Sequence, residues 1–179
     1  MNAIETNLKD AYIITNKKFD DDRGFFMESF NLKKLEKIVG ANNFVQDNHS
    51  KSSKGVLRGL HYQIEHAQGK LVRCISGAVY DVIVDLRKSS PSFGKWFGIK
   101  LCENNIQLWV PSGFAHGFYT LSDYAEIEYK VTDYYYPEYD RTLIWNDVDL
   151  GIEWGIDSNP ILSQKDLKGK TFKQCEKYV

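Results

Sequence analysis

The chain lacks the features typical of membrane proteins and nucleic-acid-binding proteins. No apolar run approaches the roughly 18 to 20 residues that a membrane-spanning helix needs, and the stretch before Phe19 has no apolar core of a signal peptide. No long block of one charge is present, since 23 basic and 24 acidic residues give a net charge of -1. The overall field therefore attracts neither nucleic acid nor an anionic membrane. We expect a cytoplasmic protein that binds neither.

Cysteine is scarce as well. The chain has three, Cys74, Cys102 and Cys175, at wide spacing and without a C-x-x-C pair. This pattern excludes a disulfide framework and suits free thiols in a reducing compartment. By contrast, 42% of the 179 residues are apolar and 14% are aromatic, which is ample for a buried core. We predict one domain over residues 1–179, with 160–179 as a peripheral C-terminal segment.

Short runs rich in β-branched and aromatic residues dominate the sequence, and Gly, Pro, Asn and Ser separate them. Only "NLKKLEKIV" indicates a helix before the C-terminal third, with Asn31 as its N-cap and Gly40 at its end. The Lys-rich stretch after Leu162 is typical of a solvated terminal helix. Many short strands without intervening helices predict an all-β fold, a jelly-roll sandwich or barrel with a few short peripheral helices.

The stretch "KLVRCISGAVYDVIVDLR" gives the strongest hairpin signal, with Ser76 and Gly77 at the turn. Alternation places Asp81 and Asp85 on one face of the second strand together with Ile83. The interior of the predicted jelly roll therefore contains polar groups.

The four histidines are His49, His61, His66 and His116. "PSGFAH" is a P-x-G-x-x-H pattern that ends at His116 and resembles the second half of the cupin metal motif. The first half should read H-x-H, but here it reads His61-Tyr62-Gln63, and a neutral amide is a poor ligand for a transition metal. A three-histidine site from His49, His61 and His116 stays open, as does a structural role for His61 in the core.

Charged and polar residues accompany His61 on the neighbouring strands. Lys70 and Arg73 face opposite ways by the two-residue period, so at most one of them enters the interior. Tyr129 shares a face with Ile127 and Val131, which favours an inward position. Charges inside a barrel must be paired or must bind a ligand. The group predicts a polar cavity, and its members are Arg58, His61, Lys70, Arg73, Asp81, His116 and Tyr129.

A second polar cluster lies nearer the N-terminus, in "DDDRGFFMES" and "QDNHS". Arg23 and Phe26 suit a phosphate beside a nucleobase, because the guanidinium binds the charge while the ring stacks on the base. A surface turn with a structural aromatic residue is the alternative.

Seven separate blocks follow one another along the chain from about Ala11 to Asp166. They are "DDDRGFFMESF", "FVQDNHSKSSKGVLRGLHYQ", "QGKLVRCISGAVYDVIVDLRKSSPSFGKW", "QLWVPSGFAHGF", "AEIEYKVTDYYYPEYD", "LIWNDVDLGIEW" and "LSQKD". In this order, they resemble the dTDP-4-dehydrorhamnose 3,5-epimerase family. The resemblance implies a cupin-type jelly roll, no metal or other cofactor, and a dTDP-4-keto-6-deoxy-sugar substrate that is converted to dTDP-4-keto-L-rhamnose in dTDP-L-rhamnose biosynthesis. It also implies a homodimer in which a segment within residues 1–30 crosses to the partner's active site.

The same resemblance implies roles for individual residues. His61 resembles the family's base, and Asp166 resembles the carboxylate that fixes its tautomer. Lys70 resembles the residue that stabilises the enolate, and Tyr129 the proton donor on the opposite face. Substrate-binding roles are implied for Arg23, Phe26, Glu28, Gln46, Asn48, Arg58 and His116, the first two donated by the neighbouring subunit.

Other functions remain open at this stage. Within enzymes, a C3-only epimerase or a 3,4-ketoisomerase needs the same base, enolate stabiliser and nucleotide site. A metal-dependent cupin oxygenase and a non-catalytic sugar-binding cupin belong to other classes. Bound metal would indicate the oxygenase, whereas failure to exchange protons at C3 and C5 would indicate the binding protein.

Overall fold

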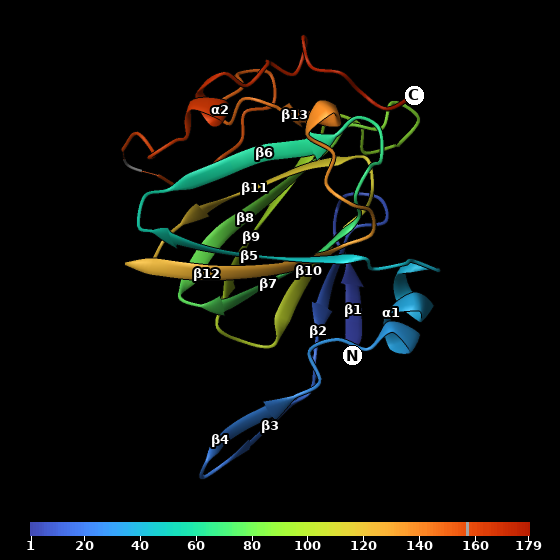
Figure 1. Ribbon diagram of the computed structural model, residues 1–179, viewed down its shortest axis with the longest axis vertical. Helices are drawn as coiled ribbons and strands as arrows, with labels where there is room; N and C mark the ends of the chain where they lie inside the picture. The colour runs from blue at the N-terminus through green and yellow to red at the C-terminus, as the bar shows by residue number, and fades with distance from the viewer. Residues whose placement is uncertain (157) are drawn as a thin grey trace.

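A computed structural model of the chain describes residues 1–156 and 158–179, and it consists of two facing antiparallel sheets (Figure 1). The predicted all-β jelly roll with short peripheral helices is confirmed. The six-stranded sheet has the order β1 (Asn2–Glu5), β2 (Tyr12–Thr15), β10 (Ile106–Val110), β7 (Lys70–Ser76), β12 (Tyr124–Val131) and β5 (Gln46–Ser53). The five-stranded sheet has the order β13 (Asp140–Thr142), β6 (Leu57–Gln63), β11 (Phe114–Thr120), β8 (Ala78–Asp85) and β9 (Trp96–Cys102).

The main core lies between the two sheets, and period-two alternation supplies it. Val72 and Ile127 from the six-stranded sheet pack against Ile83 and Phe118 from the five-stranded sheet, and all four are buried. On β8, the predicted inward face is confirmed, because Asp81 is fully buried on the same face as Ile83. The interior therefore does contain a polar group within an otherwise apolar layer.

The predicted hairpin at Ser76 and Gly77 is wrong. β7 pairs with β10 and β12, whereas β8 pairs with β11 and β9 in the other sheet. A single residue, Gly77, separates the two strands, and it has a φ of 76°. One residue is too few for the two-residue hairpin loop, and the chain instead passes from one sheet to the other.

Helix α1 (Leu32–Val39) forms as predicted, with the Asn31 side chain accepting from the amide of Lys34 and Gly40 at the C-cap. It covers the outer face of the six-stranded sheet, where Leu35 packs with Trp109. No helix in residues 1–156 and 158–179 is long and apolar enough to cross a membrane.

The predicted solvated helix at the C-terminus is largely wrong. Helix α2 covers only Gln164–Leu167, and the short 3-10 helix η1 covers Pro137–Tyr139. Beyond α2, the chain returns over the outer face of the five-stranded sheet, where Cys175 is buried and Tyr178 packs near Tyr62. Packing these side chains against the sheet removes apolar surface from water, which is more favourable than exposing them on a solvated helix. The three cysteines are free thiols, as predicted.

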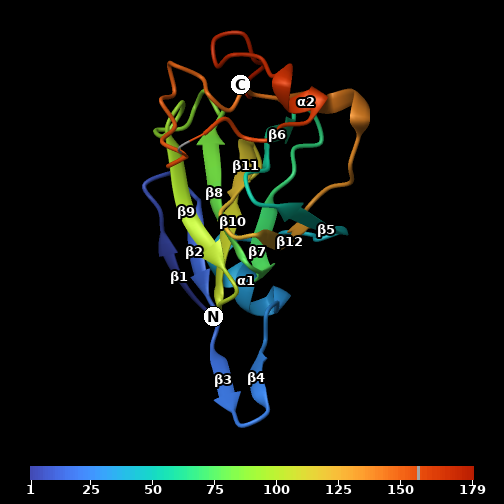
Figure 2. The same cartoon turned by 90° about the vertical axis from the view of Figure 1, so that its left-hand side faces the viewer.

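The strands β3 (Lys18–Asp21) and β4 (Gly24–Met27) form a separate hairpin that projects away from the sandwich (Figure 2). It exposes three aromatic rings, since Phe19, Phe25 and Phe26 are 50%, 54% and 69% exposed. An exposed group of large apolar side chains is typical of a surface that contacts another molecule.

Candidate active site

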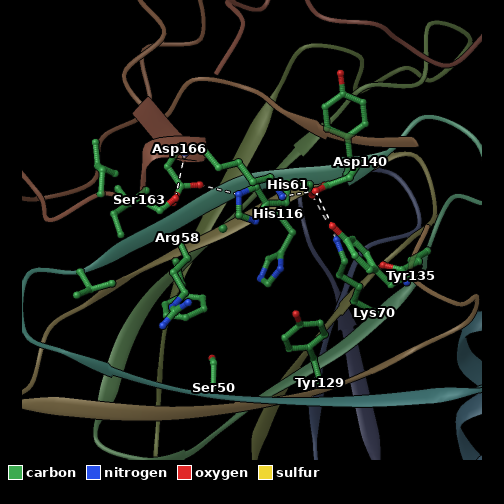
Figure 3. Close-up of a pocket in the computed structure, with 18 of the residues that line it drawn as sticks. Ser50, Arg58, His61, Lys70, His116, Tyr129, Tyr135, Asp140, Ser163 and Asp166 are labelled. Carbon is green, nitrogen blue, oxygen red and sulfur yellow. Dashed lines mark hydrogen bonds and ion pairs between the residues drawn. The ribbon is translucent and has the colours of Figure 1, made fainter. Parts of the chain in front are cut away.

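A cavity of about 550 Å³ opens between the two sheets near β6 and β12. Figure 3 shows its polar side chains converging on the space between the sheets. All four predicted catalytic residues line it, together with two of the predicted binding residues. These six are His61, Lys70, Tyr129, Asp166, Arg58 and His116.

His61 and Asp166 form the most tightly bonded pair at the cavity. The imidazole Nε2 lies 2.6 Å from Oδ1 of Asp166, whose side chain is only 4% exposed. Ser163 Oγ donates to the other carboxylate oxygen at 2.6 Å and also accepts from the backbone amide of Asp166, capping α2. Burial alone would raise the pKa of Asp166, but the hydrogen bonds from His61 and Ser163 outweigh it and hold that pKa below its usual value.

A glycine pair makes this arrangement possible. The Gly59 amide donates to Oδ1 of Asp166 at 3.3 Å, and Gly59 has a φ of 119°. A Cβ at Gly59 would lie 2.6 Å from the Cα of Gly117 on β11. Because no side chain fits there, β6 can lie close to β11 while its backbone reaches the carboxylate.

His116 and Asp81 form a second pair at the same cavity. His116 lies directly opposite His61 in the register of β11 and β6. Its Nε2 is 3.0 Å from both carboxylate oxygens of Asp81, and the two side chains are 7% and 0% exposed. Two histidines, each bonded to a carboxylate, therefore line one cavity from neighbouring strands.

Tyr129 and Lys70 come from the opposite sheet, on β12 and β7 (Figure 3). Burial raises the pKa of Tyr129, and nearby Arg58 acts in the opposite direction. Lys70 is buried, and its Nζ donates to the carbonyl of His61 at 3.3 Å. Burial lowers the pKa of Lys70 to about 8, although the charges of Asp140 and Asp81 favour its protonated form.

The predicted alternation on β7 and β12 is confirmed. Lys70 lines the cavity, whereas Arg73 faces the other side of the sheet and pairs with Glu128 at 3.1 Å. Tyr129 packs against the inner core with Ile127. At most one of the two β7 cations enters the interior, as the period of two requires.

Several cavity residues escaped the sequence analysis. Tyr135 and Asp140 lie at the cavity, where the Tyr135 hydroxyl donates to the Asp140 carboxylate at 3.1 Å. Lys165 pairs with the same carboxylate. "DYYYPEYD" has no period that could orient its side chains. Ser163 and Lys165 could have been found, because they stand three residues and one residue before Asp166 in an S-x-x-D capping pattern.

The remaining predicted binding residues lie outside the cavity in the described part of the chain. Arg23, Phe26 and Glu28 belong to the projecting hairpin or its end, where Arg23 bonds to Asp21 and Glu28 to Lys34. Gln46 and Asn48 bond to each other on β5, at 2.8 Å.

The three-histidine alternative does not form. His49 is exposed on β5 and pairs with Glu126 at 3.1 Å, whereas His61 and His116 line the cavity. Among residues 1–156 and 158–179, no group of three or more His, Cys, Asp or Glu side chains is arranged as metal ligands. Gln63, which stands where the H-x-H pattern has its second histidine, bonds to backbone groups instead.

The fold and the site define a cupin-type sandwich whose cavity holds a histidine–carboxylate pair on one side and a tyrosine on the other. The family model described as dTDP-4-dehydrorhamnose 3,5-epimerase matches residues 5–174. The chain therefore belongs to the dTDP-4-dehydrorhamnose 3,5-epimerase family, a family of isomerases.

Similar proteins carry the same name. The chain is 56% identical to the dTDP-4-dehydrorhamnose 3,5-epimerase of Shigella flexneri, covering 100% of both chains. It is 57% identical to that of Escherichia coli strain K12, covering 93% of this chain and 91% of the relative. A crystal structure of the dTDP-6-deoxy-D-glucose-3,5-epimerase of Legionella pneumophila, in complex with dTDP-4-keto-L-rhamnose, superposes with a TM-score of 0.95 at 47% identity, covering 98% and 94%.

Proposed function

We propose that the chain inverts C3 and C5 of dTDP-4-keto-6-deoxy-D-glucose and so forms dTDP-4-keto-L-rhamnose, in dTDP-L-rhamnose biosynthesis. One observation carries this proposal: His61 and Tyr129 face one cavity from opposite sheets. Inversion removes a proton from one face of a carbon and returns one to the other face. Because C3 and C5 both flank the C4 ketone, the same pair of groups serves both carbons.

His61 is the proposed base. Its Nε2 donates to Asp166, which leaves the lone pair of the neutral ring on Nδ1 for the substrate proton. Taking up that proton makes an imidazolium, which the ionised Asp166 stabilises in turn. The depressed pKa of Asp166 supports this role, because it keeps the carboxylate charged at neutral pH.

Removal of the proton leaves negative charge on the C4 oxygen of the enolate. Lys70 lines the same cavity and can donate a hydrogen bond to that oxygen. A buried cation acts strongly there because little water screens it. Tyr129 then donates its hydroxyl proton to the carbon from the face opposite His61. Proton exchange with water restores the neutral imidazole and the tyrosine hydroxyl before the second carbon reacts.

The Tyr129→Phe variant tests the proposal. In D₂O, the wild type should replace both the C3 and the C5 protons of the substrate with deuterium, as followed by proton NMR. Tyr129→Phe should still exchange protons through His61, but it should form the inverted product about 10² to 10⁴ times more slowly, as for loss of a general acid.

The matched control is Tyr80→Phe. Tyr80 lies on β8 against Trp154, on the outer face of the five-stranded sheet, and its variant should invert normally. Full inversion by Tyr129→Phe would contradict the role of the tyrosine. Exchange at C3 alone in the wild type would indicate a C3-only epimerase, and no exchange would indicate a sugar-binding cupin.

The substrate's nucleotide is proposed to occupy the side of the cavity near Arg58 and β5. Arg58 donates from Nε to Ser52 at 2.9 Å, a bond that orients its guanidinium at the cavity. A planar guanidinium suits pyrophosphate because it can donate two hydrogen bonds at once. Gln46 and Asn48 remain predicted contacts of the nucleotide.

We also propose a homodimer in which the β3–β4 hairpin reaches the partner's cavity with Arg23, Phe26 and Glu28. The exposed rings and the projection of the hairpin support this arrangement. A cytoplasmic location is proposed with it, because the cysteines are free thiols.

Subunit mixing tests the dimer. The variants His61→Asn and Arg23→Ala/Phe26→Ala should each lose most activity, but exchange of subunits should rebuild one intact site in each mixed dimer. Random pairing of equal amounts should restore about a quarter of wild-type activity. Unmixed samples serve as controls, and the absence of recovery in samples whose mixed dimers are verified by native mass spectrometry would contradict the crossing.

A further inference from the structure

Gln63 occupies a place that the proposed chemistry leaves unexplained. It lies two residues after His61 on β6, is only 4% exposed and uses its whole amide on backbone groups. Nε2 donates to the carbonyls of His66 at 2.8 Å and Tyr134 at 3.1 Å. Oε1 accepts from the amide of Tyr136 at 2.6 Å. Gln63 therefore bonds to the peptide groups on both sides of Tyr135.

Two further glutamines hold the same segment. Gln46 on β5 accepts from the amide of Tyr135 at 3.3 Å, and Gln68 donates to the carbonyl of Asp133 at 2.8 Å. Residues 133–136 lie outside every strand of the described chain. Side-chain amides thus supply backbone hydrogen bonds that a sheet would otherwise supply. We call Gln46, Gln63 and Gln68 the glutamine clamp.

The clamped segment carries a cavity residue. Tyr135 lines the cavity, is 52% exposed and has its hydroxyl bonded to Asp140. Such a ring presents free surface to a ligand at the cavity mouth. Its position depends on the backbone at residues 134–136, because its hydroxyl bond to Asp140 joins only the tip of the ring to the protein.

We propose that Gln63 is a positioning residue for substrate binding, which acts by holding Tyr135 at the cavity. The proposal rests on the proposed function, because it assigns the substrate as the ligand that Tyr135 contacts. Removing the amide of Gln63 leaves three backbone groups without their partners, and buried unpaired groups drive local rearrangement. The ring would then sample positions away from the substrate.

Hydrogen exchange tests the clamp itself, independently of any activity. In Gln63→Met, a substitution of similar volume, the amide of Tyr136 should exchange with deuterium at least about tenfold faster, while the strands of both sheets keep their protection. Unchanged exchange at Tyr136 would overturn the proposed clamp even if the protein is an epimerase.

A double-mutant cycle tests the functional consequence. Gln63→Met should raise KM for the sugar nucleotide about tenfold with a smaller change in kcat. The contact that is lost stabilises the bound substrate and the transition state equally. In a Tyr135→Ala background, the same substitution should change KM by less than about twofold, because the residue through which it acts is gone. Equal effects in both backgrounds would overturn positioning through Tyr135.

Gln107→Met is the matched control. Gln107 is a buried glutamine on the outer face of the six-stranded sheet, where its Nε2 donates to Ser29 at 2.7 Å. Its substitution should show no coupling with Tyr135→Ala.

Gln46→Met extends the cycle: coupling to Tyr135 indicates a clamp role, whereas an additive effect would exclude Gln46 from the clamp. If the wild type fails to exchange C3 and C5 protons, the proposed function fails while the amide exchange at Tyr136 still decides the clamp.

Discussion

Replacing His61 with asparagine should lower turnover by about 10³-fold or more and abolish deuterium exchange at both C3 and C5. Asparagine keeps a hydrogen-bonding side chain of similar reach, but it has no basic nitrogen. The substrate proton then has no basic nitrogen to accept it. The carboxylate of Asp166 does not take over this role, because it is bonded to Ser163 and the Gly59 amide. Proton NMR in D₂O measures exchange and product formation in one experiment.

His49→Asn is the control for this substitution. His49 also pairs with a carboxylate, that of Glu126 at 3.1 Å, but it is exposed on β5. Its variant should exchange both protons at the wild-type rate. Residual exchange by His61→Asn at more than about a tenth of the wild-type rate would mean that another group removes the proton.

Replacing Lys70 with methionine should have two opposite effects. Turnover should fall about 10² to 10³-fold, because the developing enolate loses its buried cation. The melting temperature should rise at pH 7, because burial has lowered the pKa of Lys70 to about 8 from 10.5. That difference corresponds to a folding penalty on the order of 3 kcal/mol, which methionine removes.

The same pKa shift predicts how the stability of the folded protein changes with pH. The folded protein binds fewer protons at Lys70 than the unfolded chain between about pH 8 and 10.5, so wild-type stability should rise with pH across that window. Below pH 8 the penalty is fully present. Lys70→Met should lose this rise, and wild-type activity should decline above about pH 8 as the ammonium deprotonates.

Lys173→Met provides the comparison, since Lys173 is an exposed partner of Asp149. It should change neither turnover nor melting temperature measurably, as is usual for exposed ion pairs. A Lys70→Met protein that is less stable than the wild type at pH 7 would contradict the inference that burial of the charge is a net cost.

The strand periodicity predicted which side chains face the interior. Alternation distinguished Lys70 from Arg73 and placed Tyr129 inward with Ile127, because side chains on a strand alternate with a fixed period of two. The same rule placed Asp81 in the interior. The inward-facing side chains of the strands could therefore be predicted locally, strand by strand, whereas cavity residues outside the strands could not.

Which strands pair with one another could not be predicted from this alternation. The stretch on either side of Gly77 alternates equally well in a hairpin and in a crossing between sheets, so the hairpin prediction failed. Long-range packing also decided the C-terminal segment, where Cys175 and Tyr178 are held against the sandwich. The position of Tyr135 depends on glutamine side chains from elements far apart in sequence, which no local pattern encodes.

The distance in sequence between His61 and Asp166 also orders the events of synthesis. The two residues are 105 positions apart, and all thirteen strands in the part of the chain that the structure describes precede Asp166. Translation therefore delivers every strand of the sandwich before the carboxylate that completes the pair. A nascent chain can therefore pair its strands on the ribosome while His61 still lacks Asp166, so the sheets can form before the pair that transfers the proton is complete.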